Sequence, residues 1–409
     1  MHLRYLKNLF ISVFILSFIL LSINMLIDPF ATNHFFDIRG FNHSKPEAKH
    51  HDILVKLFEV YRLKPEVATL GNSRIRYGLN IEDARWNGDR IYNFGVEGAG
   101  VDEVHYLLEH AAAQGKLNKV IISIDFGSFN AGDIMKGMEN FNYSLLTNTR
   151  DWNPFREQMA MLQIAMSVDT LEASLETIKF NIYNKNKNIE ILPSAVISKN
   201  DYRNRFLQTE HRFLISNSRN VIFKNNSRGS MFDHFRKIIK FCYKHNIDAR
   251  FIISPTHAWQ SEIEDVVGLQ PQLIYYKRKL VNILAEESNG SGKSPFHLWD
   301  FSGYNSITTE TVPDCGSNKI MTNYFDPSHY KPVVGLLVLE RVLNQNINNV
   351  PKDFGIELTS KNIEDNLVKI SKDQKQWRID HPADYRQIVQ LNKLFSKSDI
   401  PYFSLCHRP

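Results

Sequence analysis

The 409-residue sequence has few of the residues that mark several specialised classes of protein. Its three cysteines (Cys242, Cys315 and Cys406) are too few for a disulfide-built scaffold and match no zinc-binding spacing, which leaves one disulfide or buried free thiols open. With 19 glycines and 15 prolines, the chain is neither collagen-like nor of low complexity. The net charge is only +5, so we expect no nucleic-acid partner. We also expect no metal and no other cofactor.

Only one long hydrophobic run is present, and it lies at the N-terminus. The 19 residues from Leu9 to Ile27 carry no charge and would span about 28 Å as a helix, close to the hydrocarbon thickness of a bilayer. Arg4 and Lys7 precede the run, which predicts that the rest of the chain lies across the inner membrane, in the periplasm or outside the cell. A cleaved signal peptide is the alternative, but its apolar core is usually shorter. We therefore expect residues 1–30 to form a retained anchor.

Short apolar segments alternate with amphipathic helical patterns between residues 60 and 345. Predicted strands cover residues 66–70, 90–94, 119–124, 248–254 and 296–299. Predicted helices cover residues 51–62, 101–113, 229–245, 262–287 and 333–344. This alternation predicts an α/β domain over residues 31–345, with a central parallel sheet covered on both faces. Residues 131–227 break the rhythm and are interpreted as a mostly helical insertion or cap, and residues 346–409 as a polar, partly helical extension.

A first polar stretch, Gly71-Asn72-Ser73-Arg74, follows the first predicted strand. Open α/β sheets place their ligands at the carboxyl ends of the strands. A serine at a strand-to-helix turn can expose its hydroxyl there, beside the free amides of the helix N-terminus. On its own the stretch also fits a plain turn with a capping residue.

A second stretch, residues 93–100 (NFGVEGAG), follows the second predicted strand. Its three glycines allow the backbone to approach a ligand closely and to offer unhindered N–H groups. A helix entry that requires positive φ is the alternative interpretation.

A third stretch, residues 325–329 (FDPSH), precedes the last apolar helix. Asp326, three residues ahead of His329 on a loop held by Pro327, can orient the imidazole so that it accepts a proton from a serine. An Asp-Pro turn with a surface histidine is the alternative.

Together, the three stretches resemble the sequence blocks of the SGNH (GDSL-like) hydrolases, in the chain order Ser, Asp, His. The resemblance implies that Ser73 is the nucleophile, His329 the general base and Asp326 the group that orients the base. It also implies an oxyanion hole formed by the backbone N–H groups of Ser73 and Gly98. The implied fold is a three-layer α/β/α arrangement with an inserted helical cap.

The chain departs from the family pattern at two points. Asn72 stands where the family has Asp, and the block that supplies an oxyanion-hole Asn is missing. Asn130 is a candidate for a displaced donor, and Asp125 is interpreted as structural or as part of the site edge. The anchor and the missing block resemble a membrane-anchored subgroup, which includes the alginate O-acetyltransferases and the teichoic acid D-alanyl transfer protein.

Other candidates lie at the same edge of the predicted sheet. His257 and Trp259 follow the fourth strand, where they would contact and stack on a sugar, although a helix-start His with a packed Trp is the alternative. Arg74 and Arg76 would bind an anionic group of a glycan, or form ordinary ion pairs.

The resemblance and the anchor together imply an acyltransferase, with acetyl as the expected group, that modifies an extracytoplasmic polysaccharide through an acyl-Ser73 intermediate. A membrane-bound partner would then supply the acyl group. Two alternatives remain open: an esterase with the same triad, and a glycan-binding or assembly protein with a degenerate site.

Overall fold

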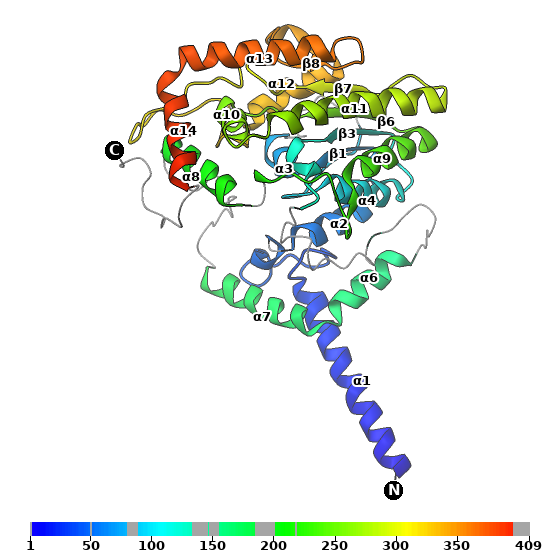
Figure 1. The fold of residues 1–409 in the computed structure, drawn as a ribbon. Coiled ribbons are helices and arrows are strands. Elements are labelled where there is room, and N and C mark those ends of the chain that lie inside the picture. Colours follow the sequence, from blue (N-terminus) through cyan, green and yellow to red (C-terminus); the bar gives the residue numbers. More distant parts are fainter. Residues whose placement is uncertain are drawn as a thin grey trace. The chain divides into compact units, whose positions relative to one another are not determined.

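The structure is a computed structural model of the whole chain. It describes residues 2–49, 51–79, 89–132, 146, 155–184, 201–216 and 219–395 (Figure 1). The chain forms two compact units that alternate along the sequence. The first comprises residues 1–64, 109–115 and 137–193, and the second residues 65–108, 116–136 and 194–409. This division differs from the three consecutive segments that the sequence suggests, because residues 31–64 and part of the predicted insertion group with the N-terminal helix.

The N-terminal helix α1 (His2–Ile27) dominates the first unit. Within the described residues, it is the one helix that is long and apolar enough to cross a membrane, over Leu3–Ile27. Its last turns pack against two helices of the predicted insertion. The other elements of the unit are η1 (Pro46–Lys49), α2 (Asp52–Leu63), α6 (Arg156–Ala165) and α7 (Val168–Tyr183).

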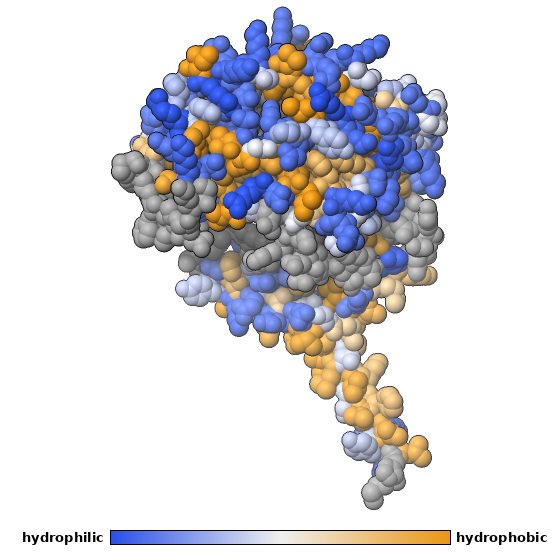
Figure 2. All heavy atoms as spheres, viewed as in Figure 1, coloured by the Kyte–Doolittle hydropathy of each residue, from blue (hydrophilic) through white to orange (hydrophobic). Residues whose placement is uncertain are grey.

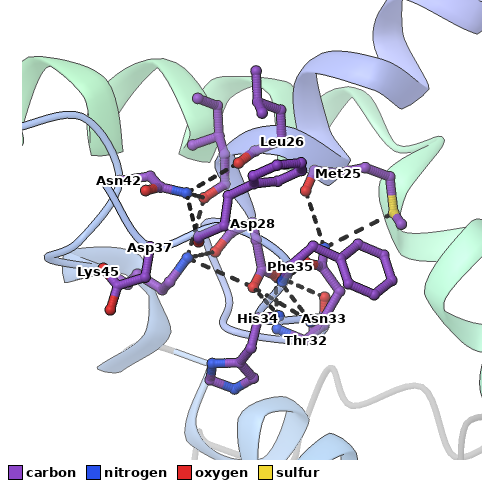
Figure 3. Close-up of polar contacts among 12 residues, drawn as sticks. Met25, Leu26, Asp28, Thr32, Asn33, His34, Phe35, Asp37, Asn42 and Lys45 are labelled. Carbon is purple, nitrogen blue, oxygen red and sulfur yellow. Dashed lines mark hydrogen bonds and ion pairs between the residues drawn. The ribbon is translucent and has the colours of Figure 1, made fainter. Parts of the chain in front are cut away.

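Side chains from the following loop close the carboxyl end of α1 (Figure 3). A helix leaves its last carbonyl groups without helical donors, and a buried helix end must find other ones. Three side chains donate at 3.0–3.1 Å, and a backbone carbonyl of α1 accepts from each. The bonds run from Asn33 to Met25, from Asn42 to Leu26 and from Lys45 to Ile27.

The buried carboxylate of Asp28 organises the same loop (Figure 3). It accepts hydrogen bonds from the backbone N–H groups of Thr32 and His34, at 2.7 and 3.0 Å. The Lys45 ammonium lies 3.6 Å away, and burial lowers the pKa of Lys45 although Asp28 acts to raise it. The chain therefore leaves α1 through a turn that these hydrogen bonds hold in place.

The second unit contains a six-stranded sheet in the order β2-β1-β3-β6-β7-β8. Its first five strands in the chain are parallel, and short β8 runs antiparallel at the edge. The strands are β1 (Val67–Gly71), β2 (Ile91–Gly95), β3 (Lys119–Ser123), β6 (Asp248–Ile253), β7 (His297–Asp300) and β8 (Ile356–Glu357). A separate hairpin pairs β4 (Lys224–Asn225) with β5 (Gly229–Ser230). The five predicted strands are confirmed within one residue at either end, and with them the α/β class.

Helices cover both faces of this sheet. Neighbouring residues of β6 point to opposite sides: the Phe251 ring packs on Phe235 of α9 with centroids 5.1 Å apart, while Ile252 joins the main hydrophobic core. That core includes Ile75 and buried residues of α8, α10, α12 and α14. The helices are α3 (Ser73–Gly78), α4 (Val101–Ala112), α8 (Tyr202–Ile215), α9 (Met231–His245), α10 (Ala258–Val266), α11 (Gln270–Ser291), α12 (Pro332–Leu343), α13 (Ile363–Asp380) and α14 (Pro382–Phe395).

Two parts of the second unit differ from the sequence prediction, and the structure also decides between the alternatives left open for the cysteines. The helix predicted over 262–287 is two helices, because Gly268 adopts φ +86° between them. The extension after residue 345 adds β8 to the sheet, and its helices α13 and α14 pack on α11 and on α8 and α10. Cys242 is a buried free thiol, whereas Cys315 is disulfide-bonded and Cys406 lies outside the described residues.

A glycine-to-glycine contact sets the approach of α3 to α12. A Cβ atom on Gly335 would lie 1.8 Å from the carbonyl oxygen of Gly78, and one on Gly78 would overlap the ring of Tyr330. The backbones can approach this closely only because neither residue has a side chain. This contact connects the helix that begins at Ser73 with the segment that follows His329.

We predict that Gly335→Ala destabilises the protein by about 3 kcal/mol, because overpacking a tight contact forces the backbones apart. Chemical unfolding of the full-length protein in detergent measures the effect. Gly290→Ala, in α11 with open space around it, is the matched control and should leave stability unchanged or slightly higher. Equal effects of the two substitutions would contradict the close-contact interpretation.

Candidate active site

Asn72 places Ser73 at the first position of α3. The Asn72 side-chain oxygen accepts from the Arg74 N–H at 2.9 Å, which is the usual bond of a helix N-cap. The same residue's amide donates to Asp125 Oδ2 at 3.0 Å and to Ser128 Oγ at 3.1 Å. One side chain therefore fixes the start of α3 and ties it to the segment that follows β3.

The buried carboxylate of Asp125 connects the carboxyl ends of three strands. Besides Asn72 after β1, it accepts from Ser123 Oγ at 2.9 Å in β3 and from the Ser254 N–H at 2.7 Å after β6. The Arg74 guanidinium lies 3.8 Å away. These partners satisfy a buried charge that would otherwise be costly. The sequence marked Asp125 as structural or at the site edge, and the structure gives it this connecting position.

Ser73, His329 and Asp326 lie in one hydrogen-bonded row. Ser73 Oγ is 2.9 Å from His329 Nε2, and His329 Nδ1 is 2.9 and 2.8 Å from the two oxygens of Asp326. Because a carboxylate can only accept, Nδ1 carries the proton and the Nε2 lone pair faces the serine hydroxyl. The histidine is thus held in the tautomer that can remove the serine proton.

Asp326 is held in its charged form. Burial acts to raise its pKa, but the His329 ring and hydrogen bonds from the N–H groups of Ser328 and His329 outweigh burial and lower it. The carboxylate therefore stays ionised at neutral pH and stabilises a positive charge on the imidazole.

The glycine-rich stretch is fixed beside the end of β1. The Val96 N–H donates to Gly71 O at 2.9 Å, and Ser128 Oγ donates to Ala99 O at 3.0 Å. Gly98 adopts φ +70°, a conformation that favours glycine. Within the described residues, no acceptor is recorded for the backbone N–H of Ser73 or of Gly98.

Asn130 is not brought into contact with the serine or the histidine by any hydrogen bond of the described residues. Its side chain is buried, and its carbonyl oxygen accepts from the N–H groups of Gly132 and Ile222 at 3.1 and 3.0 Å. Its amide nitrogen has no partner in the described part of the chain. These contacts hold the chain at residue 222, and the role of Asn130 as an oxyanion donor stays a prediction.

His257 and Trp259 are buried in the core, which corrects their assignment to a substrate surface. The ring of His257 caps α10 through the Trp259 N–H and contacts the Glu310 carbonyl at 2.8 Å, and burial lowers its pKa to about 4. Phe206 of α8 packs edge-on against both rings. The structure agrees with the alternative interpretation, in which the histidine starts a helix and the tryptophan packs in the core.

The two arginines after Ser73 differ in their surroundings. Arg74 is half-buried and donates to Thr256 Oγ1 at 3.2 Å, whereas the Arg76 guanidinium lies 5.2 Å from the centre of the Tyr77 ring. The edge of the Tyr77 ring in turn faces His329. Of the four residues predicted to contact substrate, His257 and Trp259 are buried in the core, and the two arginines lie beside Ser73 and His329.

A cavity of about 300 Å³ lies at the carboxyl ends of β3 and β6, beside the triad. Arg74 lines it, but neither Ser73 nor His329 does. Helices α10, α11 and α13 form its other walls through Glu264, Lys277 and Gln374. The extension after residue 345, for which the sequence suggested no role, thus closes a cavity next to the candidate site.

A hydrogen-bonded chain joins this cavity to the triad. Ser328, whose N–H bonds to Asp326, donates from Oγ to Gln260 Oε1 at 3.0 Å, and Gln260 Nε2 donates to Glu264 at 3.1 Å. Burial raises the pKa of Glu264 to about 7, although the nearby Arg74 acts to lower it. The polar line from Asp326 to Glu264 has no signal in the sequence, since its members come from separate loops and helices.

No family model matches the chain, and no curated protein matches it. Within the described residues, no group of three or more His, Cys, Asp or Glu side chains could hold a metal ion. The geometry of the site itself therefore carries the functional argument.

We predict that Asn72→Asp destabilises the protein by about 3 kcal/mol at neutral pH, because it replaces a donor with a second carboxylate against Asp125. Like charges raise the pKa of such a pair, so one proton binds as the pH falls and the deficit shrinks. Unfolding at pH 8 and pH 5, relative to the parent, measures this change. Asn72→Ser keeps the helix cap without the charge, and its deficit should not vary with pH.

We also predict that Glu264→Gln becomes more stable relative to the parent as the pH rises. The folded-state pKa of about 7 lies above the usual 4.5, so the parent loses stability as the pH rises through that window. The difference is on the order of 3 kcal/mol at most between pH 5 and pH 8. Unfolding curves across this range test it, with the exposed Glu172→Gln on α7 as control, and a flat difference would contradict it.

Proposed function

We propose that the chain is an SGNH-like acyltransferase that is anchored in the membrane and acylates a polysaccharide outside the cytoplasm. The observation that carries the proposal is the row Ser73–His329–Asp326, with 2.9 Å between Ser73 Oγ and His329 Nε2. That separation is the one that proton transfer from a serine nucleophile requires.

In the first step Ser73 Oγ attacks the carbonyl carbon of an acyl donor while His329 Nε2 takes the hydroxyl proton. The tetrahedral oxyanion would be stabilised by the backbone N–H groups of Ser73 and Gly98, for which no acceptor is recorded in the described residues. The bond to the donor then breaks, and His329 gives its proton to the departing group. Asp326 remains ionised and stabilises the imidazolium throughout.

In the second step a sugar hydroxyl attacks the acyl-Ser73 ester. His329 removes the hydroxyl proton, and the ester bond to Ser73 breaks as the same proton returns to Ser73 Oγ. Transfer thus leaves the enzyme in its starting state and forms one sugar ester for each donor consumed. If water attacks instead, the same residues act as an esterase, which is the second candidate function.

The proposed location outside the cytoplasm has two supports. Arg4 and Lys7 lie on the N-terminal side of α1, the charge arrangement that keeps this end in the cytoplasm. The disulfide at Cys315 fits an oxidising compartment. Since acyl-CoA is a cytoplasmic donor, a membrane-bound partner would have to pass the acyl group across.

We predict that a fluorophosphonate probe labels Ser73 of the full-length protein in detergent and fails to label Ser73→Ala. The reason is that the probe reacts with an activated serine whatever the natural substrate is. Ser227→Ala, at an exposed hairpin residue, is the matched control and should label like the parent. Mass spectrometry of the labelled peptide reads the result, and an unlabelled parent would contradict the catalytic proposal.

The same variants separate transfer from hydrolysis. With an activated acetyl ester and an oligosaccharide, the parent should form acetylated sugar, and Ser73→Ala should lose at least about 1,000-fold of the rate. Free acetate without acetylated sugar would favour the esterase instead.

A further inference from the structure

Helix α7 exposes an apolar face and buries a polar one, the reverse of what a water-soluble surface helix does. Its buried face carries small and polar residues, which pack toward α1 and η1. These residues are Thr170, Ala173, Ser174, Thr177 and Asn181. The outward stripe at helical spacing consists of Val168, Leu171, Leu175, Ile178 and Ile182. Three of these are strongly exposed: Val168 at 71%, Leu175 at 49% and Ile182 at 64%.

Helix α6 also exposes an apolar stripe and buries only small residues. Its buried residues are Ala160 and Ala165. An uncharged stripe at a spacing of three or four residues faces outward, beginning at the residue before the helix and ending at the residue after it. It consists of Phe155, Met159, Leu162 and Met166. The loop after α1 adds exposed Phe35, Phe36 and Ile38 in the same unit.

Hydrogen bonds hold these helices to the end of α1. Asn24, the one strongly polar residue of the apolar run, is buried there, and its amide donates to Ala165 O and Ser167 O at 2.9 and 3.1 Å. Its carbonyl oxygen accepts from Ser174 Oγ at 3.0 Å. The exposed stripes therefore belong to helices that pack on the carboxyl end of α1, and Figure 2 shows the apolar surface of α1 running up to its junction with the body of the unit.

We propose that α6, α7 and the residues 35–38 form a collar that lies in the outer interface of the bilayer around α1. The uncharged run of α1, Leu9–Ile27, spans about 28 Å as a helix, against roughly 30 Å of hydrocarbon. Because this run fills the hydrocarbon and ends at Ile27, directly before Asp28, the last turn of α1 lies at the boundary with the headgroups, where interfacial helices bury their apolar faces. A charged stripe on α7 would then face water, and it consists of Asp169, Glu172, Glu176 and Lys179.

Single-cysteine labelling of the full-length protein tests the collar. Leu175→Cys and Ile182→Cys on the apolar stripe are compared with Glu172→Cys and Glu176→Cys on the charged stripe of the same helix. Each protein carries an environment-sensitive fluorophore and is reconstituted in vesicles of phosphatidylethanolamine and phosphatidylglycerol. The protein without an added cysteine gives the background labelling.

We expect the two apolar-stripe probes to be quenched by lipids spin-labelled near the top of the acyl chain, and to be quenched several-fold less by aqueous iodide than the two control probes. Equal iodide quenching at all four positions would overturn the collar. Nanodiscs that hold one copy each provide the second arm: if protection appears only when several copies share a disc, the stripe is an interface between copies and the proposal is wrong. Neither result depends on the activity of Ser73.

Discussion

The carboxylate of Asp125 lies where the carboxyl ends of β1, β3 and β6 meet, and the position of the Ser73 hydroxyl depends on it. Each hydrogen bond to a buried charge contributes roughly 1.5–3 kcal/mol, and Asp125 accepts three at 2.7–3.0 Å. One of them comes from the side-chain amide of Asn72, and the side-chain oxygen of the same residue caps α3. The strand ends and the start of α3 are therefore fixed by a single connected group of polar atoms.

This arrangement also gives a physical reason for an asparagine at residue 72. An aspartate there would place a second carboxylate against Asp125, whereas asparagine supplies a donor on one side and an acceptor on the other. Ser128 extends the same group to the glycine-rich stretch through Ala99 O. Through Ser128 and Asp125, the segment after β3 therefore supports both the turn at Asn72 and the glycine-rich stretch.

The sequence predicted what depends on local patterns. The five parallel strands are short, mostly apolar runs, and each of the three stretches that follow strands or precede α12 lies where its pattern suggested. The contact between Ser73 and His329, which are 256 residues apart, could not be predicted in this way. It depends on the close approach of Gly78 and Gly335, and no periodic pattern in the sequence indicates that pair. His257 and Trp259 lie after the expected strand, yet Phe206 of the insertion covers them, and burial by a distant helix is not encoded nearby. Helix α13 buries only Ile363, Asn366, Gln374 and Trp377, too thin an apolar stripe to be recognised.

Helices α6 and α7 of the first unit also have an orientation that their local sequence does not predict. Read alone, residues 155–182 give an amphipathic pattern, and the usual rule assigns the apolar stripe to a protein core. The contacts of Asn24 oppose that assignment. A buried amide in an apolar helix needs polar partners, and here they are the Ala165 and Ser167 carbonyls and the Ser174 hydroxyl. Once those bonds turn the small and polar faces of α6 and α7 toward α1, their apolar faces must point away from the unit. In water such surfaces would be a liability, whereas beside a helix that is long and apolar enough to cross a membrane they extend the region that can contact lipid.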